Sequence, residues 1–208
     1  MHIRKIFISI LLLFPLVLQA QNGNDSKTVT VVTPIYDQKV SLHIPSTWKQ
    51  GFEDLKADHY MIEFIPQNET IKKWENMISV QGFKGIAAKS TPEKFLNRLA
   101  SRFQNLCGKN LVYLKGGSGQ ISGFASSAAI IGCSNVEEDH STGLKKGQGE
   151  LGMYYAIRGM NDLYLVHKAI RGDSANVSLN GENVGDFITP ILPIKLCKKG
   201  GPRTECLN

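Results

Sequence analysis

The chain has 208 residues, and its 24 basic residues against 18 acidic ones give a formal net charge of +6. The basic excess is scattered, and it comes nearest to a patch in the stretch KLCKKGGPR near the C-terminus. Nucleic-acid binding normally requires a basic face with aromatic or helix-borne readers, so we expect no nucleic-acid partner.

The N-terminus has the pattern of an export signal. MHIRK is basic, IFISILLLFPLVL is an apolar run too short to span a bilayer comfortably, and LQA follows as a cleavage site. We predict a signal peptide over residues 1–20 and a disordered leader over 21–27; an uncleaved membrane anchor is the alternative. The mature chain of about 188 residues keeps 22 basic residues, a formal balance of +4, and suits one domain with no stable membrane insertion.

Four segments before residue 90 read as strands. They are KTVTVVTPI (27–35), QKVSLHIP (38–45), HYMIEFIP (59–66) and NMISVQGFKG (76–85). In the second segment, Val40, Leu42 and Ile44 alternate with polar residues, which predicts one buried and one exposed face. We expect the first two strands to form a hairpin that turns at Tyr36–Asp37.

One long helix is predicted after the fourth strand. Thr91 suits the N-cap position and Pro92 the first helical position, where a missing N–H has no consequence. Gly108 suits the position just after the last turn. An apolar stripe at helical spacing lies between them, formed by Phe95, Leu96, Leu99, Phe103 and Leu106.

The next two strands, NLVYLKG (110–116) and QISGFASSAAIIGCS (120–134), are expected to be joined by the glycine-rich turn GSG. Small residues follow one face of the second strand: Ile121, Gly123, Ala125, Ser127, Ala129, Ile131 and Cys133. If the helix packs on this face, Cys107 at its end falls near Cys133. Four cysteines in an exported chain predict two disulfides with three connectivities, and this placement favours Cys107–Cys133 with Cys197–Cys206.

A polar loop over residues 134–149 leads to a last hairpin, ELGMYYAIRG and DLYLVHKAI, which turns at Met160–Asn161. Pro190 and Pro193 limit any helix in the C-terminal stretch GDFITPILPIKLC. The fold class is therefore α+β: a largely antiparallel sheet of about seven or eight strands, a long helix on one face and a second helical segment allowed on the other. We expect a single domain over residues 28–196 and a disulfide-closed tail over 197–208.

Several of these segments carry a resemblance to known proteins. IPSTWKQGF, MIEFIPQNETIKKWENMISVQGF, the helix TPEKFLNRLASRFQNLC and the terminal pair in CKKGGPRTEC are similar to a family of exported bacterial proteins with no established function. The order of strands and helix also resembles the Mog1/PsbP-like architecture, an antiparallel sheet between helices. The resemblance implies a periplasmic or secreted protein, and its motifs are packing and turn motifs.

Two tryptophans have a structural and a functional interpretation. Trp48 follows the second strand, and Trp74 ends the helix-like turn ETIKKWE. We predict both as structural aromatic anchors, because burying such a ring stabilises a fold by roughly 2–3 kcal/mol. A ligand-stacking role is the alternative.

The loop VEEDHSTG (136–143) is the one candidate site for ion binding or acid–base chemistry, through Glu137, Asp139 and His140. Adjacent loop residues rarely converge on one ion without a ligand from elsewhere, so a solvated loop is favoured. We predict no metal and no cofactor.

Other titratable residues give little sign of catalysis. His167 shares a strand face with Leu163 and Leu165, and we expect a structural histidine with satisfied hydrogen bonds; His43 and His59 stand alone. The chain contains no G-x-S-x-G, H-E-x-x-H or P-loop motif, so no catalytic residue is predicted. The tripeptide RGD (171–173) is interpreted as a turn rather than as an integrin ligand.

These observations favour an exported, periplasmic or secreted, non-catalytic binding or accessory module with an unknown protein partner. One alternative is a hydrolase with its site near the 134–149 loop. The other is a secreted host-contact factor that displays Arg171–Asp173.

Overall fold

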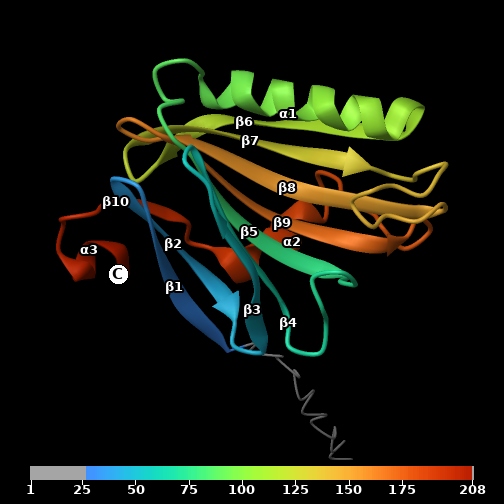
Figure 1. Ribbon diagram of the computed structural model, residues 1–208, viewed down its shortest axis with the longest axis horizontal. Coiled ribbons are helices and arrows are strands. Elements are labelled where there is room, and N and C mark those ends of the chain that lie inside the picture. Colours follow the sequence, from blue (N-terminus) through green and yellow to red (C-terminus); the bar gives the residue numbers. More distant parts are fainter. Residues whose placement is uncertain (1–26, 208) are drawn as a thin grey trace, which may run out of the picture.

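In a computed structural model, which describes residues 27–207, two antiparallel sheets stack against each other and a long helix covers part of the larger sheet (Figure 1). The predicted signal peptide, residues 1–20, and most of the predicted leader, residues 21–26, lie outside the described residues. None of the described helices is long and apolar enough to cross a membrane.

The larger sheet has seven strands in the order β3-β4-β5-β9-β8-β7-β6, all paired antiparallel. Its strands, in chain order, are β3 Trp48–Leu55, β4 His59–Pro66, β5 Asn76–Phe83, β6 Leu111–Ile121, β7 Phe124–Cys133, β8 Gln148–Arg158 and β9 Leu163–Asp173. The smaller sheet has the order β1-β2-β10, with β1 Thr28–Ile35, β2 Gln38–Pro45 and β10 Lys195–Lys198.

The main core lies between the two sheets. Val40, Leu42 and Ile44 of β2 are buried there, as their alternation predicts, against inner-face residues such as Ile78 and Val166 of the larger sheet. Two short helices close the molecule on this side and at the C-terminus: α2 Val184–Ile188, followed by a 3-10 turn over Thr189–Ile191, and α3 Arg203–Leu207.

The predicted long helix is confirmed as α1, Pro92–Cys107. The Thr91 hydroxyl accepts a hydrogen bond from the Lys94 N–H, Pro92 occupies the first turn, and Gly108 follows with a φ of 55°. A 3-10 turn over Gly108–Asn110 then leads into β6. Leu96 and Ala100 of the helix pack on Ala129 and Ile131 of β7.

The two disulfides join the pairs expected from the sequence. Cys107–Cys133 connects the end of α1 to the end of β7, and Cys197–Cys206 closes the C-terminal segment. Small residues on the helix-facing side of β7 allow α1 to lie close to the strand, and this proximity brings the first pair of sulfurs together.

One local prediction was wrong, the turn between β6 and β7, and two strands, β3 and β10, were not predicted. The stretch containing Trp48 forms a strand, β3, whose alternation is interrupted by a bulge between Gln50 and Phe52. The hairpin of β6 and β7 turns at Ser122–Gly123, both with positive φ, instead of at GSG, where Gly117 belongs to a bulge. The stretch after Pro193 forms β10, which pairs with β2 and creates a second sheet.

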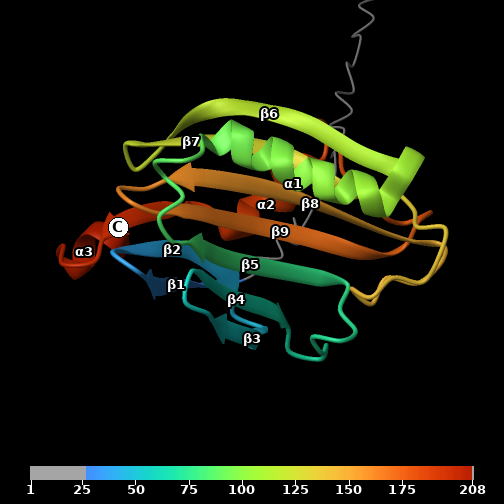
Figure 2. The same cartoon turned by 45° about the horizontal axis from the view of Figure 1, so that its top comes forward.

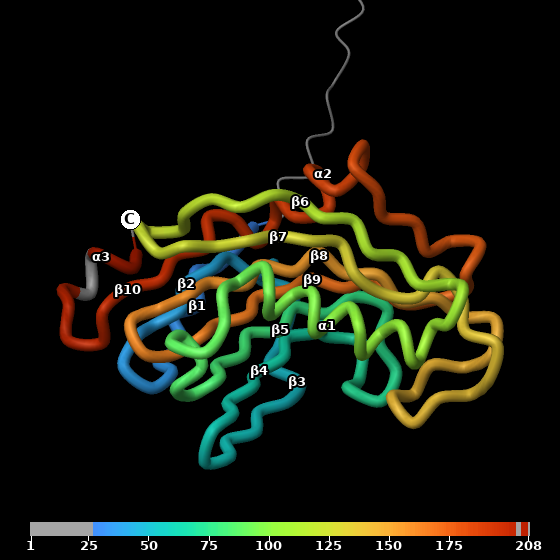
Figure 3. Tube along the Cα trace, turned by 90° about the horizontal axis from the view of Figure 1, so that it is seen from above, coloured from blue at the N-terminus to red at the C-terminus, as the bar shows by residue number. Residues whose placement is uncertain are grey.

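The helix covers only part of the outer face of the larger sheet. Figure 2 shows α1 running along β6, β7 and β8, whereas β5, β4 and β3 extend beyond it uncovered. From above, β6 follows one long side of the molecule and the β3–β4 hairpin projects from the opposite side (Figure 3). The fold therefore leaves two features on the helix side: an uncovered part of the sheet and a free strand edge.

Candidate functional site

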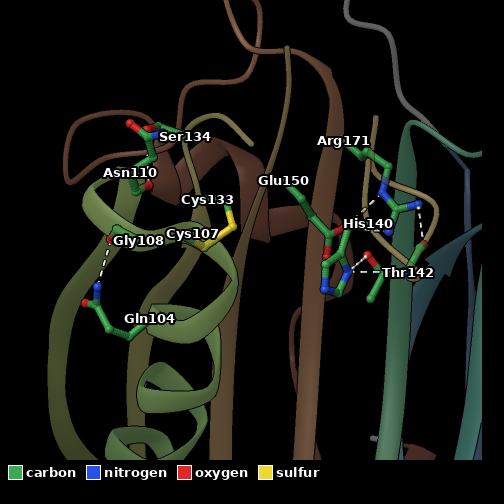
Figure 4. Close-up of a disulfide and its surroundings, with 10 residues drawn as sticks. All are labelled: Gln104, Cys107, Gly108, Asn110, Cys133, Ser134, His140, Thr142, Glu150 and Arg171. Atoms are coloured by element: carbon green, nitrogen blue, oxygen red, sulfur yellow. Dashed lines mark hydrogen bonds and ion pairs between the residues drawn. A yellow bond between two sulfur atoms is a disulfide. The ribbon is translucent and has the colours of Figure 1, made fainter. Parts of the chain in front are cut away.

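The predicted loop residues lie beside the C-terminal end of α1. A surface pocket of about 470 Å³ separates the helix end from the loop and is lined by Cys107, Lys109, Glu137, Asp139 and His140, among others. Figure 4 shows the Cys107–Cys133 disulfide next to this loop, with His140 turned toward Thr142.

The three side chains do not act on a common centre, because each is bound to a different partner. Glu137 pairs with Lys109 at 3.0 Å, and Asp139 pairs with Lys145 at 2.8 Å. Nδ1 of His140 lies 3.1 Å from the Thr142 hydroxyl. Within residues 27–207 no three histidine, cysteine or acidic residues are grouped as metal ligands.

The lysine partners also fix the charge of the two acids. The hydrogen bond and charge of Lys109 lower the pKa of Glu137, and the hydrogen bond of Lys145 lowers the pKa of Asp139. Both carboxylates therefore stay ionised at neutral pH and are poor proton donors. The loop presents a network of surface ion pairs.

A second polar cluster, which we call the Trp74 corner, consists of Trp74, Glu150, Arg171 and Thr142. Arg171 donates to Oε2 of Glu150 through Nε at 2.8 Å and Nη2 at 2.5 Å, and its guanidinium stacks 4.0 Å from the centre of the Trp74 ring. Nη1 of Arg171 also donates to the Thr142 carbonyl at 3.3 Å. The corner therefore fastens the 134–147 loop and the turn before β5 to the middle of the sheet.

The two tryptophans differ in burial and in the residues that they contact. Trp74 is 6% exposed and packs with Ile65, Met77 and Ala169. Trp48 is half-buried at the start of β3 and packs against the main core. Both rings therefore pack against hydrophobic residues, and Trp74 also lines a surface pocket of about 270 Å³ with Glu69, Lys73 and Glu75.

The RGD tripeptide lies at the end of β9, in register with β8, and not on a displayed loop. The Arg171 side chain is 10% exposed and already paired with Glu150. The arrangement needed for an integrin-like ligand is therefore missing at this position.

Aromatic and polar side chains lie together on the uncovered part of the sheet, which we call the open face. Cross-strand partners share a face of the sheet, so the register places the members side by side. Its exposed or half-buried members are Phe52, His59, Met61, Glu63, Gln81 and Phe83, whereas Ser79 and His167, in the same cross-strand row as Glu63, are buried.

Hydrogen bonds connect the centre of the open face across two strands. Oε1 of Gln81 on β5 lies 3.1 Å from Nε2 of His59 on β4. Nε2 of Gln81 donates to the Ser79 hydroxyl at 3.2 Å. The Phe83 ring stacks on His59 and packs at a tilt of 56° against Phe95 of α1, and in both pairs the ring centroids are 4.8 Å apart. The open face is thus joined to the flank of the helix by aromatic rings.

Glu63 is an acid of the open face, and Asp54, opposite Met61, is a second acid on the same face. Burial raises the pKa of Glu63, and the charge of Glu150 raises it further, whereas Arg171 acts in the opposite direction. A charged residue inside the otherwise apolar stretch HYMIEFIP was the signal in the sequence that could have identified this position. A perturbed carboxyl beside aromatic rings is typical of a binding surface.

His167 differs from the prediction of a satisfied structural histidine. The ring is 5% exposed and stacks on Tyr154 at 4.5 Å, but its Nδ1 atom has no hydrogen-bond partner within residues 27–207. Burial lowers the pKa of His167 to about 4, so the ring is neutral at neutral pH. Tertiary packing of β8 against β9, which strand alternation does not reveal, creates this environment.

His167 predicts a specific acid sensitivity. Its pKa is about 4 in the folded chain and about 6.5 in the unfolded chain. Between pH 6.5 and pH 4 the unfolded chain therefore binds more protons, and the free energy of unfolding falls as the pH falls, by about 3 kcal/mol in total. Urea denaturation of wild type and His167→Phe across this range measures the effect, because phenylalanine keeps a ring for stacking on Tyr154. Parallel pH profiles of the two proteins would contradict it.

Comparison with known proteins identifies no family. No family model matches the chain, and no curated protein matches it. Among solved structures, a protein of Bacteroides thetaiotaomicron VPI-5482 matches 78% of this chain with 13% identity and a TM-score of 0.42; the match covers 46% of that protein, less than half of its length. The Saccharomyces cerevisiae Ran-binding protein Mog1p matches 80% of this chain and 86% of its own, with 8% identity and a TM-score of 0.42.

The Mog1p match concerns the same layout that the sequence resembles, but at a TM-score of 0.42 no conclusion is drawn from it. Both likenesses concern the fold alone, and fold does not determine function.

Proposed function

We propose that the chain is an exported, non-catalytic binding or accessory module that recognises a partner protein through its open face. Two disulfides fasten the chain within residues 27–207, and such bonds persist in oxidising compartments, which supports a periplasmic or secreted location. The basic segment and continuous apolar run at the N-terminus, which have the pattern of a signal peptide, support the same location.

The composition of the open face carries this proposal. Phe52 is 37% exposed on β3, and half-buried Met61 and Phe83 continue the apolar surface toward α1. Glu63, Gln81 and His59 add polar groups between these side chains. Aromatic and methionine side chains with a few polar groups are typical of protein-binding surfaces.

The polar groups of the open face are better suited to binding than to reaction. Gln81 is hydrogen-bonded to both Ser79 and His59, and the His167 ring is buried. Near the 134–149 loop, the alternative hydrolase site, the acids are paired with lysines. A preformed surface of this kind contacts a partner with little reorganisation.

A pair of substitutions on β3 tests the proposal. Phe52 and Leu55 are both exposed apolar residues, but Phe52 lies opposite Glu63 on the open face, whereas Leu55 lies opposite Tyr60 on the other face. We expect Phe52→Glu to weaken capture of the partner from native envelope by about tenfold or more, because a charge would enter an apolar contact. Leu55→Glu, on a side chain that is 70% exposed, should leave capture unchanged.

The measurement is affinity capture with wild type and both variants, followed by quantitative mass spectrometry. A partner captured equally by wild type and Phe52→Glu would overturn the open face as the binding surface. A hydrolytic activity of the purified chain that is lost in His140→Ala would instead favour the enzyme.

A further inference from the structure

A second surface, separate from the open face, lies at the opposite end of the larger sheet. There β6 pairs with β7 on one side only and ends the sheet, and no other described strand pairs with its outer edge. Figure 3 shows this strand along one long side of the molecule. A strand at an edge presents unpaired main-chain N–H and C=O groups, which another extended segment can bind.

The register identifies which groups face outward. Asn110 and Ser134 lie opposite each other at the start of the ladder between β6 and β7. The Ser134 N–H donates to the Asn110 carbonyl at 3.0 Å, so the two residues form a hydrogen-bonded pair. Hydrogen-bonded and non-hydrogen-bonded pairs alternate along an antiparallel ladder. Tyr113, opposite Ile131, and Lys115, opposite Ala129, therefore fall in non-hydrogen-bonded pairs and direct their N–H and C=O away from β7.

The same residues line a groove beside α1. This groove, of about 520 Å³, has Leu111, Tyr113 and Lys115 of β6 on one side and Asn97, Ser101 and Gln104 of the helix on the other. The Tyr113 hydroxyl donates to the Asn97 side chain, and Lys115 pairs with Glu93 at 3.0 Å, which fixes the position of the helix above the strand. Side chains of a strand added to β6 would enter this groove from the helix side.

The other edge of the larger sheet is less suited to strand addition. A bulge between Gln50 and Phe52 interrupts β3, and charged Glu53 and Asp54 follow the bulge. Bulges and charges are the features by which natural proteins block pairing at a sheet edge. The bulge of β6 lies beyond this segment, between Lys115 and Gly117, so from Leu111 to Lys115 the strand keeps a continuous register with β7 and carries one charged residue, Lys115.

We propose that β6 binds an extended segment of a partner protein by strand addition. The bound segment forms main-chain hydrogen bonds with Tyr113 and Lys115, as in other complexes in which a peptide extends a sheet. Residues of the segment that face α1 are small and uncharged polar, because Asn97, Ser101 and Gln104 line the groove. Each already makes one hydrogen bond within the chain, and the Asn97 amide N–H groups, the Ser101 hydroxyl oxygen and Oε1 of Gln104 are the groups that a segment would bind. Residues on the other face are aliphatic, because they would cover Leu114, which is 47% exposed.

A proline substitution removes one outward donor without touching the β6–β7 ladder. The Lys115 N–H faces away from β7, and proline is tolerated on an edge strand at such a position. Lys115→Ala is the matched control, because it also removes the ion pair with Glu93 but keeps the N–H. Leu114→Pro is the opposite control, since its N–H faces β7, and we expect it to unfold at lower urea concentration than either Lys115 variant.

The probe is a phage-displayed library of random nine-residue peptides, selected on wild type and counter-selected on Lys115→Pro. We expect the enriched peptides, made synthetically, to bind Lys115→Pro about tenfold more weakly than Lys115→Ala, the effect of one lost hydrogen bond. Bound peptide should slow hydrogen exchange of the Tyr113 and Lys115 amides in wild type. Phe52→Glu should bind the peptides as wild type does, which separates this surface from the open face.

Three results would overturn the proposal: no peptide enriched over the counter-selection, equal binding by the two Lys115 variants, or amide protection confined to other strands. A fourth result would also overturn the proposal: hydrogen exchange of the Tyr113 and Lys115 amides that slows as the protein concentration rises, with no peptide present. It would show that a second copy of the chain occupies the edge of β6. If Lys115→Pro does not fold, selection is repeated on wild type alone and amide exchange decides.

Discussion

Arg171→Ala is expected to lower the free energy of unfolding by about 3–5 kcal/mol at neutral pH, because the substitution leaves a carboxylate in the sheet without its partner. Glu150 is 13% exposed and Arg171 10%, so water replaces little of the lost interaction. The same change removes the guanidinium from the Trp74 ring and from the Thr142 carbonyl. Chemical denaturation followed by tryptophan fluorescence and circular dichroism measures the loss.

Two controls separate the buried pair from a generic charge effect. In the double variant Arg171→Ala/Glu150→Ala the unpaired carboxylate is absent, and we expect a smaller loss than in Arg171→Ala alone. Lys109→Ala breaks the pair between Lys109 and Glu137, in which both side chains are exposed, and should lower stability far less than Arg171→Ala does. A loss of the same size in Lys109→Ala and Arg171→Ala would show that burial of the Glu150–Arg171 pair has no special weight.

Loss of the Trp74 corner should also have a structural signature. Arg171 holds the 134–147 loop through Thr142, while its main-chain N–H donates to the Glu75 carbonyl in the turn before β5. In Arg171→Ala we therefore expect faster hydrogen exchange in the loop than in β8 and β9. The corner thus connects the stability of the sheet to the order of the one long polar loop.

The parts of the fold that could be predicted from the sequence are those with a local signal. Helix α1 has an N-cap at Thr91, a proline in its first turn and a glycine after its last, so its bounds were predicted closely. The hairpin of β8 and β9 and the pairing of Cys107 with Cys133 follow from alternation and from the small-residue face of β7. In each case the residues that determine the structure are neighbours in the chain or lie at a regular period.

The parts that could not be predicted depend on contacts between distant segments or on irregular backbone. The bulge near Gly51 interrupts the alternation of β3, and β10 spans only Lys195–Lys198 after two prolines. The glycines of GSG resemble a turn, yet positive φ at Ser122 and Gly123 is what closes the hairpin. A short strand such as β10 has no recognisable period of its own, and it is stabilised by pairing with β2.

The candidate surfaces were not predicted for the same reason. The open face depends on the register of four strands, which brings Phe52, Glu63, Ser79 and His167 into one row. The sequence pointed instead to the cluster VEEDHSTG, where neighbouring acids looked like a site. In the structure these acids pair with surface lysines instead: Glu137 with Lys109, just after α1, and Asp139 with Lys145 of the same loop.

The double variant Cys107→Ala/Cys133→Ala is expected to lose about 3.5 kcal/mol of stability in a chain-entropy model, because the bond closes a long segment of the chain. The two cysteines are 26 residues apart, whereas Cys197 and Cys206 are 9 apart. The matched variant Cys197→Ala/Cys206→Ala should therefore lose less, about 2.5 kcal/mol, since a shorter loop restricts the unfolded chain less. Urea denaturation under non-reducing conditions compares the two.

Removal of each disulfide should also increase hydrogen exchange in a different part of the structure. Cys107 and Cys133 pack with Val136 and Leu144, so removal of the Cys107–Cys133 bond takes support from the 134–147 loop. Amides of the loop should then exchange faster, among them the His140 N–H, which donates to the Leu144 carbonyl. Cys206 accepts a hydrogen bond from the Ser41 hydroxyl through its carbonyl, so losing the second bond should loosen β10 and leave the loop unchanged. A larger loss of stability in Cys197→Ala/Cys206→Ala than in Cys107→Ala/Cys133→Ala would contradict the entropic account. It would mean that the pairing of β10 with β2 depends on the Cys197–Cys206 bond more than the packing of α1 depends on the Cys107–Cys133 bond.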